Sequence, residues 1–112
     1  MVVRMNNKTE TVPENIKKAC ELAKNPGSCK YSNKDGSPCC VIGQLYVLEG
    51  FNVSELKNQN TTVGHIKSEN TDLLFSKYGK DRLATLQYYW DSNSYATNEQ
   101  LLEKAEEIWS SS

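Results

Sequence analysis

The sequence of 112 residues predicts a single all-α domain, and three observations support this prediction. Several stretches place apolar residues at helical spacing, and most of them have helix start or stop signals at their ends. One stretch, residues 37–50, is apolar at almost every position and would form a buried central helix. We therefore expect four to six helices around that central helix, with room for one small β-hairpin near residues 29–38.

The central stretch, SPCCVIGQLYVLEG, begins and ends with helix signals. Ser37 is a preferred N-cap residue, Pro38 fits the first helical position, and Gly50 can adopt the left-handed conformation that closes a helix. A buried strand is the alternative, because a short apolar run does not distinguish strand from helix by periodicity. Pro38 before the run and Gly50 after it favour the helix.

The first ten residues are polar and lack periodicity, so we expect a flexible tail at 1–10 and one domain over 11–112. Thr11 and Glu14 form a capping-box pair that would start an amphipathic helix over about residues 12–24. Pro26 and Gly27 would end this helix and lead into the hairpin region.

The second half of the chain contains further helix signals. We expect a short helix over 54–57, an apolar anchor at 63–66, and a helix that Asn70 or Thr71 caps and Gly79 closes. Apolar spacing then predicts a helix over about residues 81–91. Thr97 and Gln100 form a second capping-box pair, which would start the last helix.

Bulk composition argues against several classes of protein. The 13 basic and 14 acidic side chains are interspersed, so no basic field favours nucleic acid as a partner. No apolar run approaches the roughly 18 residues that a membrane span needs, and the N-terminus lacks the apolar segment of a secretory signal. We therefore expect a cytoplasmic protein without membrane contact, whose four cysteines are free thiols.

Cys40, with Cys39 beside it, is the first candidate for chemistry. It would lie at the N-terminus of the central helix, where the helix dipole lowers a thiol pKa, and His65 could act as its base. The alternative is that Cys40 is a small hydrophobic residue of the core. Because no nucleophile signature surrounds Cys40, we assign no catalytic residue.

A structural zinc ion could take its ligands from the four cysteines and the one histidine: Cys20, Cys29, Cys39, Cys40 and His65. The Cys-x-x-Cys spacing that lets one tight turn present two thiolates is absent. We therefore assign no metal site and expect no cofactor.

An aromatic cluster precedes the last helix, at Tyr88, Tyr89, Trp90 and Tyr95. Aromatic side chains are enriched at the anchors of protein interfaces. We therefore predict Tyr88, Trp90 and Tyr95 as partner-binding residues. The alternative is that these side chains lie half-buried at the rim of the core.

The order of these signals resembles a group of small phage-encoded or prophage-encoded proteins. In that group a Cys-x-Tyr extended piece precedes a Pro-x-Cys-x-x-Gly helix. The matching residues here are Cys29, Tyr31, Pro38, Cys40, Gly43 and Leu45, and the resemblance covers about residues 25–106. This chain departs from the group at Gln44, where a His is common, and at residues 95–97, where a Trp often opens the last helix. The resemblance implies a phage setting and no particular reaction.

The leading hypothesis is therefore a small phage-type accessory protein of the host cytoplasm that binds a host or phage macromolecule. Such a protein would inhibit a host enzyme or a defence factor, and its partner would be a protein. Homo-oligomerisation stays open. The alternatives are a cysteine-dependent enzyme that uses Cys40 and His65, and a small-molecule-binding or metal-binding domain.

Overall fold

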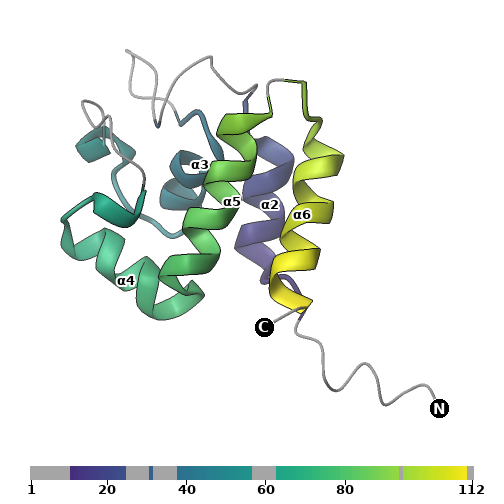
Figure 1. The fold of residues 1–112 in the computed structure, drawn as a ribbon. Helices are drawn as coiled ribbons and strands as arrows, with labels where there is room; N and C mark the ends of the chain where they lie inside the picture. Colours follow the sequence, from purple (N-terminus) through teal and green to yellow (C-terminus); the bar gives the residue numbers. More distant parts are fainter. Residues whose placement is uncertain (1–10, 25–30, 32–37, 57–62, 94, 111–112) are drawn as a thin grey trace.

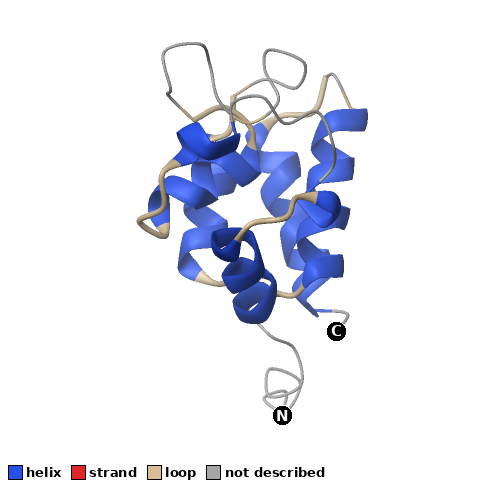
Figure 2. Ribbon diagram, turned by 90° about the vertical axis from the view of Figure 1, so that its left-hand side faces the viewer, coloured by secondary structure: helices blue, strands red, loops and turns tan. Residues whose placement is uncertain are grey.

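The computed structural model describes residues 11–24, 31, 38–56, 63–93 and 95–110. These ranges hold the helices α2 (Glu14–Leu22), α3 (Val41–Leu48), α4 (Glu69–Tyr78), α5 (Lys80–Ser92) and α6 (Asn98–Ser110), and the 3₁₀ helices η1 (Val53–Leu56) and η2 (Val63–His65). Within them there is no strand, as the view in Figure 2 also shows, so the all-α prediction is confirmed. The expected tail lies outside the described residues, as does the expected hairpin apart from Tyr31 and Pro38.

The helices pack so that the first and the last described helix meet. Helix α2 packs against both α3 and α6, and α5 packs against both α6 and α4. Figure 1 shows α6 beside both α2 and α5, with α4 at the other edge of the molecule from α6. The turn that joins α5 to α6 lies at one end of this group of helices.

Helix α3 is the buried helix that the sequence predicts. Its first six residues, Val41 to Tyr46, are all buried, because α2, α5 and η1 all pack against this helix. Gly50 has a φ of 84°, which confirms that it closes the central stretch.

The start of α3 differs from the prediction. The helix begins at Val41, so Pro38 is not its first residue. The preceding backbone makes other bonds: the Cys39 N–H donates to the Tyr31 carbonyl at 3.0 Å, and the Cys39 carbonyl accepts from Lys24 at 2.8 Å. These bonds hold the chain out of the helix until Val41. Ser37, the expected N-cap, lies outside the described residues.

The helix caps confirm one capping box and correct two other expectations. Thr97 and Gln100 form the predicted reciprocal pair, with bonds of 2.9 Å and 3.1 Å. Helix α2 begins after Pro13 without a side-chain cap, so the box starting at Thr11 is wrong. Helix α4 is capped by Ser68, whose hydroxyl accepts from the Thr71 N–H, because Ser68 has the extended conformation of an N-cap.

Candidate functional site

The described residues on both sides of the α5–α6 turn make local hydrogen bonds. The Asn93 side chain donates to the Tyr89 carbonyl at 2.7 Å. The Ala96 N–H donates to the Asn93 carbonyl at 2.9 Å, and the capping box at Thr97 then fixes the start of α6. Tyr95 therefore lies between two bonded residues, Asn93 and Ala96.

Two tyrosines are strongly exposed at this end of the molecule. Tyr95 has 97% of its surface exposed and Tyr88 has 70% exposed. Beside Tyr95 lies a hollow of about 480 Å³, lined by Tyr89, Ser92, Asn93, Tyr95, Ala96 and Gln100. Tyr88 stands one helical turn before Ser92 and therefore on the same face of α5. We call Tyr88 together with the residues that line this hollow the tyrosine surface.

Trp90 does not belong to this surface, which corrects its prediction as a partner-binding residue. Only 1% of its surface is exposed, and its indole N–H donates to the Lys24 carbonyl at 2.9 Å. The spacing of apolar residues along α5 places Trp90 on the core face with Leu83 and Leu86. Trp90 is therefore a core residue that anchors the end of the α2 segment.

The tyrosine surface already holds one cation. The Lys104 ammonium lies 5.7 Å from the centre of the Tyr89 ring and 2.7 Å from the Glu107 carboxylate. An ammonium over a tyrosine face is attracted by the negative potential of the ring. An aromatic face with a carboxylate nearby is therefore a cation-binding arrangement that this chain forms within itself.

Cys40 and His65 occupy different environments. Cys40 forms no disulfide, lies at the N-cap of α3 with only 3% of its surface exposed, and belongs to the hydrophobic core. His65 is exposed on η2. The burial of Cys40 favours the interpretation as a core residue, since a nucleophile needs access to its substrate.

Cys39 is disulfide-bonded, so the expectation of four free thiols is wrong. That expectation rested on the redox compartment, whereas pairing also depends on which segments the fold brings together. Cys29 lies outside the described residues. Within the described part of the chain, no group of three His, Cys, Asp or Glu side chains could hold a metal ion.

A second hollow, of about 570 Å³, lies beside η2 and the start of α4. Its lining includes His65, two basic residues and two acidic residues: Lys67, Lys80, Glu69 and Asp72. Because these charges balance, the lining favours neither an anionic nor a cationic ligand.

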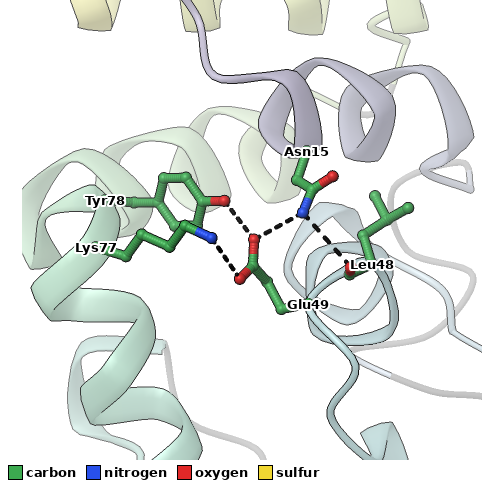
Figure 3. Close-up of polar contacts among 5 residues, drawn as sticks. All are labelled: Asn15, Leu48, Glu49, Lys77 and Tyr78. Atoms are coloured by element: carbon green, nitrogen blue, oxygen red, sulfur yellow. Dashed lines mark hydrogen bonds and ion pairs between the residues drawn. The ribbon is translucent and has the colours of Figure 1, made fainter.

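Glu49 is the centre of a polar cluster that sequence reasoning missed (Figure 3). Its carboxylate accepts hydrogen bonds from the Asn15 amide at 2.8 Å, from the Lys77 ammonium at 2.9 Å, and from the Tyr78 hydroxyl. Burial alone would raise the pKa of Glu49, but the bonds from Tyr78, Asn15 and Lys77 outweigh it and lower this pKa. The donors come from α2 and α4, so the cluster joins three helices and has a structural role.

The position of Glu49 in the sequence contained a usable signal. It is one of two strongly polar residues in an otherwise apolar stretch, and a carboxylate next to a buried helix needs partners. The identity of those partners depends on the tertiary structure, because Asn15 and Lys77 lie 34 and 28 residues away.

Comparison of the chain with protein-family models, with curated proteins and with solved structures finds no significant match. The resemblance to small phage-encoded proteins therefore stays a prediction. No helix among the described residues combines the length and the apolar character that crossing a membrane requires.

Proposed function

We propose that this chain is a small accessory protein that acts by binding a protein partner through the tyrosine surface. The observation that carries the proposal is Tyr95, which leaves 97% of its surface in solvent beside a hollow of about 480 Å³. Tyr88, with 70% exposed, adds a second aromatic side chain one helical turn from that hollow.

The physical reason is the free energy that an exposed aromatic ring can release on burial. A tyrosine buries roughly 150–250 Å² when a partner covers it, at a low cost in side-chain entropy. The bond between Ala96 and Asn93 and the capping box at Thr97 add to this, because bonded backbone loses less conformational freedom on binding. Aromatic residues of this kind dominate the binding energy of protein interfaces.

The partner that we propose is a host or phage protein, such as a host enzyme or defence factor that the chain would inhibit. This part of the proposal rests on the resemblance of residues 25–106 to small phage-encoded proteins. It is supported by the small size of the chain and by its near-neutral net charge of −1.

The test is site-specific photocrosslinking. A photoreactive phenylalanine analogue replaces Tyr95 in one variant and Leu73 in the matched control, since Leu73 is 57% exposed on α4, away from the tyrosine surface. We expect a defined protein from a bacterial host lysate to crosslink at position 95 and not at position 73. Mass spectrometry then identifies this protein, which is purified for binding measurements.

Calorimetry with the purified partner completes the test. We expect Tyr95→Ala to weaken binding by about 30-fold, the loss typical of an interface hot spot, and Leu73→Ala to leave the affinity unchanged. Because both side chains are exposed, neither substitution should alter thermal stability by much. Equal crosslinking at both positions, or full affinity of Tyr95→Ala, would contradict the proposal.

A further inference from the structure

The acidic side chains of this chain are in excess in the segment that starts at the end of α5 and includes part of the tyrosine surface. Residues 91–112 contain five acidic side chains and one basic side chain, whereas residues 1–90 contain nine acidic and twelve basic ones. The net charge of −1 therefore conceals an acidic C-terminal segment. This segment begins at the end of α5 and includes the whole of α6.

Helical geometry collects these acids on the outward face of α6. The buried residues Leu101, Ala105 and Trp109 define its inner face. On the opposite side, four glutamates are exposed: Glu99, Glu103, Glu106 and Glu107. Glu107 pairs with Lys104, whereas the other three have no ion-pair partner among the described residues.

This acidic face starts where the tyrosine surface ends. Tyr95 lies in the turn immediately before α6, and Glu99 lies in the first turn of that helix. Gln100 lines the hollow and belongs to the same first turn. Tyr95 and Glu99 are therefore close along the chain, and the other two glutamates continue from Glu99 along the exposed side of α6.

We propose that the partner's contacting segment is rich in arginine and lysine and lies across the tyrosine surface and along the outward face of α6. The proposal rests on the proposed function, because it specifies the chemistry of that partner. Guanidinium and ammonium groups stack on tyrosine rings and pair with carboxylates. Lys104 shows this recognition within the chain itself, between the Tyr89 ring and Glu107.

The probe is a fluorescein-labelled peptide of alternating arginine and glycine, and its counterpart carries glutamate in place of arginine. Fluorescence anisotropy measures the affinity of the full chain for each peptide at low and at moderate salt. We expect binding of the arginine peptide alone, with an affinity that falls as salt screens the charges. Amide chemical-shift changes should then map to residues 88–107.

Matched triple variants separate a local surface from a general charge effect. Glu99→Gln, Glu103→Gln and Glu106→Gln neutralise the outward face of α6. The control variant changes the net charge by the same amount at exposed positions of α2 and α5, through Glu14→Gln, Glu21→Gln and Asp81→Asn. We expect the α6 variant to lose about 10-fold in affinity, in line with the loss of several exposed ion pairs, and the control to stay within 2-fold.

Three outcomes would overturn the inference: no binding of the arginine peptide, an equal loss in both triple variants, or shift changes that lie mainly outside residues 88–107. The affinity of each variant for the purified crosslinked partner shows whether only this inference fails or whether the proposed function fails as well. If Tyr95→Ala weakens binding of that partner and the α6 variant does not, the proposed function stands, and the inference that the partner's segment is basic is wrong. If Tyr95→Ala leaves that affinity intact, the proposed function itself fails.

Discussion

Gly43 sets the separation between α3 and the backbone of Tyr31. A Cβ atom added at Gly43 would lie 2.1 Å from the Tyr31 carbonyl oxygen, which is far inside van der Waals contact. The close approach explains why a helix interior, where glycine normally costs stability relative to alanine, holds one here. The small residue in the Pro-x-Cys-x-x-Gly pattern therefore has a steric role.

We expect Gly43→Ala to destabilise the protein by about 2–3 kcal/mol, because the backbone must shift to relieve the overlap. Urea denaturation followed by circular dichroism measures the change. Gly64→Ala is the matched control, since its added Cβ would lie at an ordinary 3.5 Å from the end of the Lys80 side chain. A stabilising effect of Gly43→Ala would show that α3 and Tyr31 are not packed as described.

Cys20 and Cys40, which form no disulfide, provide a second test at single residues. Burial, with a smaller contribution from the charge of Glu21, raises the pKa of the Cys20 thiol to about 12, and Cys40 is buried as well. We therefore expect both to resist iodoacetamide at pH 8 in the native protein and to react in urea, as mass spectrometry would report. Rapid native modification of Cys40 alone would instead favour the cysteine-dependent enzyme.

At the scale of the elements, Glu49 connects α2, α3 and α4. The lowered pKa of its carboxylate means that folding favours the ionised form. Its contribution to stability is therefore complete above the unfolded pKa of about 4.3 and is lost as the pH falls through the lower folded value.

We expect Glu49→Gln to lower the free energy of unfolding by about 1–2 kcal/mol at pH 7 through its weakened hydrogen bonds. The loss of stability between pH 7 and pH 3 should be smaller in this variant than in the wild type. Urea titrations at several pH values measure both effects, with the exposed Glu103→Gln as control. An unchanged pH profile would show that Glu49 is not the group that titrates.

The sequence predicted helices better than it predicted their first residues. Apolar periodicity identified α2, α5 and α6, because that periodicity reports the buried face directly, whereas α3 was identified by its apolar run between Pro38 and Gly50. The start of α3 was missed because backbone bonds from Lys24 and Tyr31 hold Cys39 outside the helix, and such distant bonds leave no local signal.

The candidate site was predicted in part for the same reason. Tyr88 and Tyr95 lie off the apolar stripe and are exposed, as their spacing indicated. Trp90 lies on the stripe and is buried. The acidic face of α6 is visible in the sequence only when charge is counted by segment, because the total for the chain is nearly zero.

At the scale of the whole molecule, one hydrophobic core joins the first described helix to the last. Helix α2 packs on α6, and the Asn98 side chain at the start of α6 donates to the Cys20 and Ala23 carbonyls, at 2.8 Å each. These contacts span more than 70 residues, so neither helix can bury its apolar face without the other. The described helices should therefore unfold as one unit.

Trp90 and Trp109 provide a direct measurement of this cooperativity, because both are buried, one in α5 and the other in α6. We expect tryptophan fluorescence and far-ultraviolet circular dichroism to give the same urea midpoint. A fluorescence transition at lower urea would show that α5 and α6 separate from the remaining helices first.

Tyr31 connects segments that are distant in the sequence. Its carbonyl accepts from the Cys39 N–H, and its hydroxyl accepts from Gln87, whose side-chain oxygen in turn accepts from the Val63 N–H at 2.7 Å. A change at one of these positions alters the geometry that the others require. In homologous sequences, positions 31 and 87 should therefore be substituted together, so that coevolution of the two sites would record the packing of the Tyr31 side chain on α5.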